Sequence, residues 1–195
     1  MDRRTFLWTT TAMLAGAGLG FDSHTAEAQD LEFLAAVERA QLERPKHLTS
    51  KARIAPESEP GNPLIVHGRA LAEDGNTPIE HGVVFAYHTD RAGYYDRAGA
   101  PPHSWRLKGW ALTDADGRFE FDTIRPGAYP RHTTPEHIHI GIFVPDGRRY
   151  WADGLVFDDD PLLPAADRAT AGHVRREGGV QHMDFTFRLN PKNRF

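Results

Sequence analysis

Residues 137–144 have the sequence His-Ile-His-Ile-Gly-Ile-Phe-Val. Successive side chains of a β-strand point to opposite faces, so this segment has one continuous apolar face, formed by Ile138, Ile140, Ile142 and Val144. The opposite face carries His137, His139 and Gly141, and we expect the glycine to leave open space beside the two imidazoles. Residues two apart on a strand lie about 7 Å from each other, which lets two imidazoles converge on one metal ion. The alternative is a pair of ordinary surface histidines on an edge strand.

Six other short segments have the composition of β-strands and are separated by turn signals rich in Gly, Pro and Asp. They are residues 64–71, 82–88, 105–113, 118–124, 149–157 and 180–189. About seven strands at this spacing favour an all-β fold, an antiparallel β-sandwich, over any α/β arrangement. Residues 31–41 have helical spacing of apolar side chains and predict one short N-terminal helix, which packs on its own domain or on a second subunit.

The first 28 residues have the pattern of an export signal rather than of folded structure. Arg3 and Arg4 precede a weakly apolar run, and Ala26-Glu27-Ala28 supplies the small residues of a cleavage site. The pattern resembles a twin-arginine signal and predicts a periplasmic or secreted protein, an ordinary signal with a chance arginine pair being the alternative. The predicted organisation is therefore a signal over 1–28, a helix and Pro-rich tether over 29–63, and one functional domain over 64–195.

Composition excludes several classes of function. The chain of 195 residues has no cysteine, which rules out disulfides, zinc–thiolate sites, iron–sulfur clusters and thiol nucleophiles. A formal charge of −4 argues against a nucleic-acid partner. No second apolar run of transmembrane length follows the signal, so the mature form is expected to have no membrane segment. Metal or catalytic chemistry must therefore use His, Tyr, Asp or Glu.

Two tyrosine segments precede the histidine strand. In Thr123-Ile124-Arg125-Pro126-Gly127-Ala128-Tyr129-Pro130, the Pro-Gly pair predicts a type II turn that presents the phenol of Tyr129. Gly93-Tyr94-Tyr95 lies in a polar loop after the strand over 82–88. Each tyrosine alone is equally compatible with packing or with ordinary surface.

Taken together, the three segments resemble the intradiol ring-cleavage dioxygenases. The pattern of that family is G-x-Y, then T-D-x-x-G-x-[FY]-x-F-x-T-I-[RK]-P-G-x-Y-P, then H-I-H. Here these elements are 93–95, 113–130 and 137–139, and the likeness extends over about residues 64–165, including the segment 157–162.

The resemblance implies a non-haem Fe(III) held by Tyr95, Tyr129, His137 and His139. It also implies cleavage of a catechol-type ring between its two hydroxylated carbons with O2, which gives a muconate-type diacid. By motif position, Tyr129 would leave the metal and accept the substrate's proton, and Tyr95 would remain bound. Two phenolates suit a ferric ion because they offset its charge.

Two positions depart from the family pattern. Thr134 stands where an arginine is common, and Gly154 where a glutamine is common. By the resemblance, both differences remove a polar side chain that contacts the substrate. The remaining candidates for substrate binding are Arg131, Gly141 and Thr134. The two differences motivate an alternative function, a non-catalytic β-sandwich that binds a partner or carbohydrate and retains the scaffold with or without the metal.

Other candidate sites have simpler interpretations. A two-His, one-carboxylate Fe(II) site ranks last, because Glu136 alternates to the face opposite both histidines. Residues 114–117 predict a hairpin turn rather than a calcium loop, and the acidic run 158–160 predicts a solvated loop. His88 has no paired spacing and is expected to be hydrogen-bonded or at the surface. The sequence leaves a homo-oligomer and the identity of the aromatic substrate open.

Overall fold

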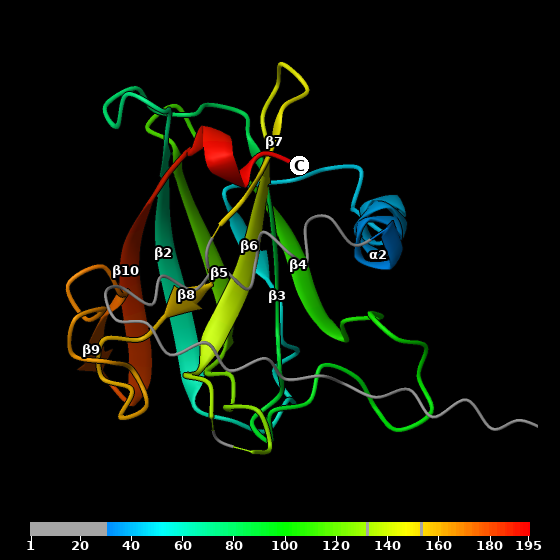
Figure 1. The fold of residues 1–195 in the computed structure, drawn as a ribbon, viewed down its shortest axis with the longest axis vertical. Helices are drawn as coiled ribbons and strands as arrows, with labels where there is room; N and C mark the ends of the chain where they lie inside the picture. The colour runs from blue at the N-terminus through cyan, green and yellow to red at the C-terminus, as the bar shows by residue number, and fades with distance from the viewer. Residues whose placement is uncertain (1–30, 132, 153) are drawn as a thin grey trace, which may run out of the picture.

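A computed structural model describes residues 31–131, 133–152 and 154–195 (Figure 1). The predicted export signal over 1–28 lies outside the described residues. Within the described part of the chain, no helix has both the length and the apolar character needed to cross a membrane.

The described chain forms two β-sheets and one α-helix. The first sheet has the strand order β1 (Lys51–Arg53), β5 (Arg118–Ile124), β2 (Pro63–Leu71), β10 (Val180–Arg188) and β9 (His173–Glu177). The second has the order β4 (Leu107–Leu112), β3 (Val83–His88), β6 (His137–Phe143) and β7 (Arg149–Trp151), and β8 (Leu155–Val156) also pairs with β6. A short 3-10 helix, Pro191–Asn193, follows β10. The predicted β-sandwich is confirmed.

The strand directions differ in part from the wholly antiparallel prediction. β10 runs parallel to β2 from the pair Gln181–Leu64 to the pair Arg188–Leu71, and β1 runs parallel to β5. Neither pair is joined by a hairpin, so no tight turn forces the two strands to run in opposite directions. The other pairings are antiparallel.

The strand boundaries contain three further differences. The single strand predicted over 149–157 is two short strands, β7 and β8. β1 and β9 were not predicted, because both are short and most of their residues are exposed, so neither has the alternating apolar pattern of a half-buried strand. β1 lies within the segment predicted as a tether, and Ile54 and Ala55 directly after it are buried in the core.

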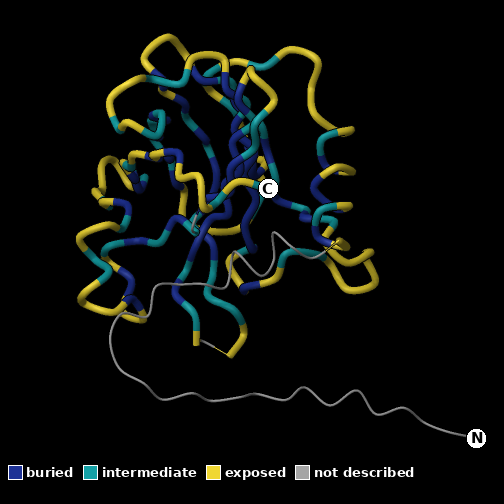
Figure 2. The backbone as a smooth tube through the Cα atoms, turned by 45° about the horizontal axis from the view of Figure 1, so that its top comes forward, coloured by how far each residue is buried: buried dark blue, intermediate teal, exposed yellow. Residues whose placement is uncertain are grey.

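The core lies between the two sheets, and Figure 2 shows buried residues concentrated along the strands. Along β2, β4 and β5 buried residues alternate with less buried ones, whereas β3 and β6 are buried along almost their whole length. β6 contributes Ile138, Ile140 and Ile142, each 1% exposed or less, so the predicted apolar face is confirmed. These side chains meet Val66 of β2 and Phe121 of β5 in one cluster. The histidine face of β6 therefore points away from the sandwich interior.

Helix α2 (Leu31–Leu42) covers that outward face of the second sheet. Its buried residues are Phe33, Ala36, Val37 and Ala40. They form a second apolar cluster with Phe85, Tyr87, Trp105 and Trp151. Figure 1 places the helix on the side of the molecule away from β9 and β10. The helix thus packs on its own domain, which settles the choice that the sequence left open.

His88, at the end of β3, points into the core and is fully buried. Its Nδ1 lies 2.7 Å from the carbonyl oxygen of Thr89, and its Nε2 lies 2.7 Å from Oγ1 of Thr123 on β5. Burial disfavours the charged imidazolium and lowers the pKa of His88 from 6.5 to about 4, although the hydrogen bond to Thr89 opposes the shift. The expectation of a hydrogen-bonded histidine is confirmed.

This shift predicts a pH-dependent stability. Between about pH 6.5 and pH 4 the unfolded chain binds a proton that folded His88 excludes, so the free energy of unfolding should fall by about 1.4 kcal/mol per pH unit, or about 3 kcal/mol in total. Urea unfolding of the metal-free protein, compared with His88→Gln at each pH, isolates this contribution. A difference between the two proteins that does not change from pH 7 to pH 4 would contradict the assignment.

Candidate metal centre

Four side-chain atoms from three separate segments meet beside β6. The phenol oxygen of Tyr95 lies 2.6 Å from that of Tyr129, 2.6 Å from Nε2 of His139 and 3.5 Å from Nε2 of His137. The Tyr129 oxygen lies 3.0 Å from Nε2 of His137, and the two Nε2 atoms are 3.1 Å apart. The four residues singled out from the sequence therefore lie together.

Strand β6 positions the two histidines. His137 and His139 point to the outward face of the second sheet, and both are buried. The expected open space at Gly141 is absent, because the indole ring of Trp151 on the neighbouring strand β7 fills it. A Cβ placed on Gly141 would lie 2.8 Å from that ring. Gly141 thus admits Trp151 and does not offer room for a substrate.

Tyr129 is positioned by the turn that follows β5 and by the side chain of Arg125. The guanidinium pairs with Glu136 at 2.5 Å and with Asp159 at 2.8 Å, and it lies 4.4 Å from the centre of the Phe157 ring. Burial alone would lower the pKa of Arg125, but hydrogen bonds to the two carboxylates outweigh that cost and raise it. Because Glu136 directly precedes His137, the ion pair links the Tyr129 turn to the start of β6.

Two glycines let the loop of Tyr95 contact the turn of Tyr129. A Cβ on Gly93 would lie 2.1 Å from the carbonyl oxygen of Ala128, and one on Gly127 would lie 2.4 Å from that of Arg91. The backbone amide of Gly127 donates to the carbonyl of Asp90 at 2.9 Å, and the hydroxyl of Thr89 donates to the carbonyl of Gly127 at 2.7 Å. Side chains at either glycine would hold the two backbones apart.

The predicted type II turn is wrong. Such a turn requires a positive φ at its third residue, and Gly127 does not have one. The glycine is needed for close backbone approach rather than for a left-handed conformation. A Pro-Gly pair is compatible with both uses, and the sequence alone does not distinguish them.

Tyr94 and Tyr95 point in different directions. Tyr94 is 54% exposed, whereas Tyr95 is partly buried with its oxygen in the four-atom cluster. Asp90 holds this loop, because its Oδ1 accepts from the amides of Ala92 and Tyr94 at 2.9 and 3.1 Å. The structure therefore selects Tyr95 as the inward-facing tyrosine.

The hydrogen bonding of His137 sets which of its nitrogens faces the cluster. Nδ1 donates to the carbonyl oxygen of Pro135 at 2.7 Å, because a carbonyl only accepts. In the neutral imidazole Nε2 then carries a lone pair, which points toward the other three atoms. A bond of this kind fixes the ring orientation of metal-binding histidines.

The four atoms fit a cation better than they fit hydrogen bonds alone. The five contacts among them would need five hydrogens. Neutral side chains bring at most three: one on each phenol and one on Nε2 of His139. Donor atoms that each lie about 2 Å from one ion are about 3 Å apart, close to the observed spacing. Two phenol oxygens and two imidazoles are a donor set suited to ferric iron.

Carboxylates do not complete a metal site in the described part of the chain, where no group of three or more His, Cys, Asp or Glu side chains is arranged to hold an ion. Glu136, the carboxylate next to the histidines, pairs with Arg125. Any metal site formed by His137 and His139 therefore draws on the tyrosines.

The candidate substrate contacts lie in the connecting segments. Arg131 is exposed and Thr134 is half-buried, both between Tyr129 and β6, and Gly154 is half-buried between β7 and β8. None of the distances within the four-atom cluster involves them. Their role in binding stays a prediction.

The acidic run 158–160 is only in part the solvated loop that its composition suggested, because Asp159 is exposed and Asp160 is buried. Asp160 is 1% exposed, and its carboxylate accepts from the amides of Glu136 at 2.6 Å and Leu162 at 2.7 Å. Asp159 pairs with Arg125 and with Arg176, which lowers its pKa against the opposing effect of burial. The pairing of β8 with β6 brings this run next to His137. This strand pairing cannot be predicted from the composition of the acidic run.

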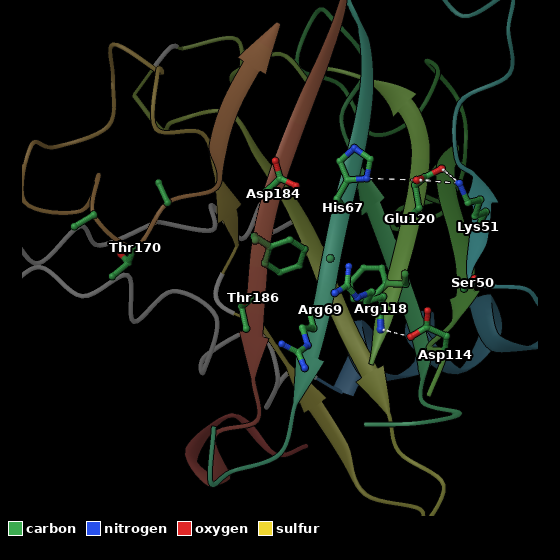
Figure 3. A pocket seen from close by; sticks show the side chains of 15 residues that line it. Ser50, Lys51, His67, Arg69, Asp114, Arg118, Glu120, Thr170, Asp184 and Thr186 are labelled. Carbon is green, nitrogen blue, oxygen red and sulfur yellow. Dashed lines mark hydrogen bonds and ion pairs between the residues drawn. The ribbon is translucent and has the colours of Figure 1, made fainter. Parts of the chain in front are cut away.

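A hollow of about 690 Å³ lies on the outward face of the first sheet, the sheet that does not contain β6 (Figure 3). Its charged lining side chains include Lys51, Arg69 and Arg118 together with Asp114, Glu120 and Asp184. Several of these charges are already paired, Lys51 with Glu120 at 3.2 Å and Asp184 with Arg175 at 3.1 Å. The hollow contains none of the residues predicted for the site.

The sequence profile of a family described as Dioxygenase matches residues 38–189. The chain belongs to the intradiol dioxygenase family. The matched span includes all four cluster residues and every strand of the sandwich. Family membership thus agrees with the resemblance carried by the tyrosine and histidine motifs.

Individual relatives of this family member are distant. The chain is 36% identical over 117 residues to the protocatechuate 3,4-dioxygenase beta chain of Burkholderia cepacia, a match that covers 53% of this chain and 48% of that protein. It is 27% identical over 201 residues to catechol 1,2-dioxygenase 2 of Acinetobacter lwoffii, covering 84% of this chain and 73% of that protein. The chain thus spans between about half and three quarters of these curated relatives.

Among solved structures, the dioxygenase domain of a dioxygenase–carbohydrate-binding protein fusion from Streptomyces sp. SirexAA-E superposes with a TM-score of 0.59 at 26% identity. The match covers 75% of this chain and 91% of that domain. The β-sandwich is therefore the shared scaffold of this intradiol dioxygenase family member and its structural relatives.

The close approach at Gly127 gives a test of how the site is assembled. Gly127→Ala should separate the two tyrosine loops, cost about 1–3 kcal/mol in the free energy of unfolding and weaken metal retention, because the added Cβ overlaps the Arg91 carbonyl. Denaturant unfolding and metal analysis of the purified variant measure both effects.

Gly99→Ala is the matched control for this variant. Gly99 has φ +85, and a Cβ added to it would meet no atom within 4 Å, so the substitution should cost only about 1 kcal/mol of backbone strain and leave metal retention unchanged. Equal metal retention in the two variants would contradict the proposed role of the close approach.

Proposed function

We propose that this chain is a non-haem Fe(III) intradiol dioxygenase that cleaves a catechol-type ring between its two hydroxylated carbons with O2. The observation that carries the proposal is the meeting of two phenol oxygens and two imidazole nitrogens within 3.5 Å. Membership of the intradiol dioxygenase family supports the same reaction. Both atoms of O2 enter the product, a muconate-type diacid.

In this proposal Tyr95, Tyr129, His137 and His139 hold the metal. Bound ferric iron would accept the deprotonated diol and make its ring open to attack by dioxygen. His137 presents Nε2 because its Nδ1 is occupied by the Pro135 carbonyl. The burial of both histidines keeps water from competing for this side of the centre.

The two tyrosines have different roles. The Tyr95 oxygen contacts all three other donor atoms, which suits a ligand that stays in place throughout. Tyr129 is partly buried, and its turn is fixed by Arg125 and Gly127, so its phenol oxygen can take the proton of an incoming diol while its backbone stays in place. The aromatic diol is the proposed substrate class.

Oxygen consumption tests the proposed function. The protein purified with adequate iron should be coloured and should consume one O2 per diol with at least one member of a catechol panel, giving the ring-opened diacid as product. A protein that retains iron but is inert to every diol would overturn the catalytic proposal and favour the alternative of a binding module. A colourless, iron-free protein would contradict the metal site itself.

Three tyrosine variants form the second arm of the same experiment. Tyr129→Phe should keep most of its iron but slow turnover by about 10²–10⁴-fold, because the proton acceptor is lost. Tyr95→Phe should lose iron and part of the visible band, because an anionic ligand is lost. Tyr94→Phe is the matched control, since its exposed side chain points out of the cluster. Bleaching by Tyr94→Phe and not by Tyr95→Phe would show that the ligand assignment is wrong.

A further inference from the structure

The imidazole of His139 lies at one end of a stack of three aromatic rings, followed by Tyr87 and Trp105. The ring of Tyr87 lies 4.5 Å from that of His139 with an interplanar angle of 10°. The ring of Trp105 lies 4.2 Å from Tyr87 with an angle of 17°. All three side chains are at most 3% exposed. Such near-parallel packing leaves the imidazole no room to tilt unless Tyr87 moves.

Strand pairing places Tyr87 opposite the histidine. β3 and β6 are antiparallel neighbours, and Tyr87 is the register partner of His139. Directly opposed side chains of an antiparallel pair lie on the same face and within contact of each other. Tyr87 therefore lies on the outward face of the second sheet, among the residues that α2 covers.

Trp105 is held on the stack at a conformational cost. Its φ is +47°, a left-handed conformation that is an outlier for a bulky side chain and is therefore strained. Phe33 of α2 packs edge-on against Trp105 at 5.7 Å and against Trp151 at 5.2 Å. The helix thus supports the tryptophan that in turn supports Tyr87.

We infer that Tyr87 is a positioning residue that fixes the plane of His139 so that its Nε2 faces the Tyr95 oxygen, 2.6 Å away. This inference rests on the proposed metal-binding role of His139. A hydrogen bond to the Pro135 carbonyl orients the ring of His137, and the stacked ring of Tyr87 packs along the plane of His139. A metal-bound imidazole is electron-poor, so the electron-rich face of a tyrosine ring also favours the metal-bound form.

Iron affinity of matched variants tests this inference. Tyr87→Leu keeps apolar bulk but removes the ring and should weaken iron binding by about 10–100-fold, the usual effect of losing a residue that orients a metal ligand. Tyr87→Phe keeps the ring and should bind iron within about threefold of the unaltered protein. The visible band should move in Tyr87→Leu and stay in place in Tyr87→Phe.

Phe119→Leu separates positioning from general core loss. Phe119 lies on β5 of the first sheet, is 3% exposed, and its ring packs edge-on against Phe121 at 5.7 Å and Phe185 at 5.9 Å, apart from the Tyr87 stack. Phe119→Leu should destabilise the metal-free protein about as much as Tyr87→Leu and leave iron affinity unchanged. Unchanged iron affinity in Tyr87→Leu, or an equal loss of affinity in Phe119→Leu, would overturn the inference.

A measurement on the metal-free protein keeps this test independent of iron and of the folding of the variants. In the unaltered protein the ring protons of His139 should show an upfield NMR shift from the stacked Tyr87 ring, and Tyr87→Phe should retain it. The absence of that shift would overturn the inference. A protein that shows the shift but binds no iron would support the positioning of His139 and contradict the proposed function, so the two failures are distinguishable.

Discussion

Alternation along β6 is the constraint on which the rest of the site depends. Ile138, Ile140 and Ile142 are fixed in the core between the two sheets, and each is essentially inaccessible to solvent. With one face of the strand buried in this way, a register shift by one residue would expose the isoleucines and bury the histidines inside the sandwich. The free energy that stabilises the core thus also fixes His137 and His139 on the outward face. The tyrosine loops, Trp151 and the Tyr87 stack are arranged around that fixed pair.

The tyrosines reach this strand by backbone packing, because neither lies on a strand of the sheet. The loop of Tyr95 and the turn of Tyr129 contact each other through Gly93 and Gly127, where a single methyl group would overlap the opposing chain. Arg125 then ties the turn to Glu136 and Asp159. Ordered loops of this kind let a small domain bring each tyrosine oxygen to imidazoles that are 8 to 44 residues away in the sequence. The site is an extension of the sandwich surface and leaves the core intact.

Much of this arrangement could be predicted from the sequence, because period-two alternation and turn residues are local signals. The sandwich, the apolar face of β6 and the meeting of Tyr95, Tyr129, His137 and His139 all follow from such signals combined with the family resemblance. The features that were predicted wrongly depend on contacts between segments that are distant in the sequence. The parallel pairing of β10 with β2, the filling of the Gly141 face by Trp151 and the burial of Asp160 each require knowledge of which strands are neighbours. Tyr87 was missed for the same reason, since only the β3–β6 register places it on His139.

Iron X-ray absorption spectroscopy measures whether these four side chains hold one ferric ion. We expect one iron per chain with a first shell of oxygen and nitrogen donors only, and an outer scattering pattern of two imidazoles that drops to one in His139→Gln. An iron centre without imidazole scattering, or with a spectrum unchanged by His139→Gln, would contradict this ligand assignment.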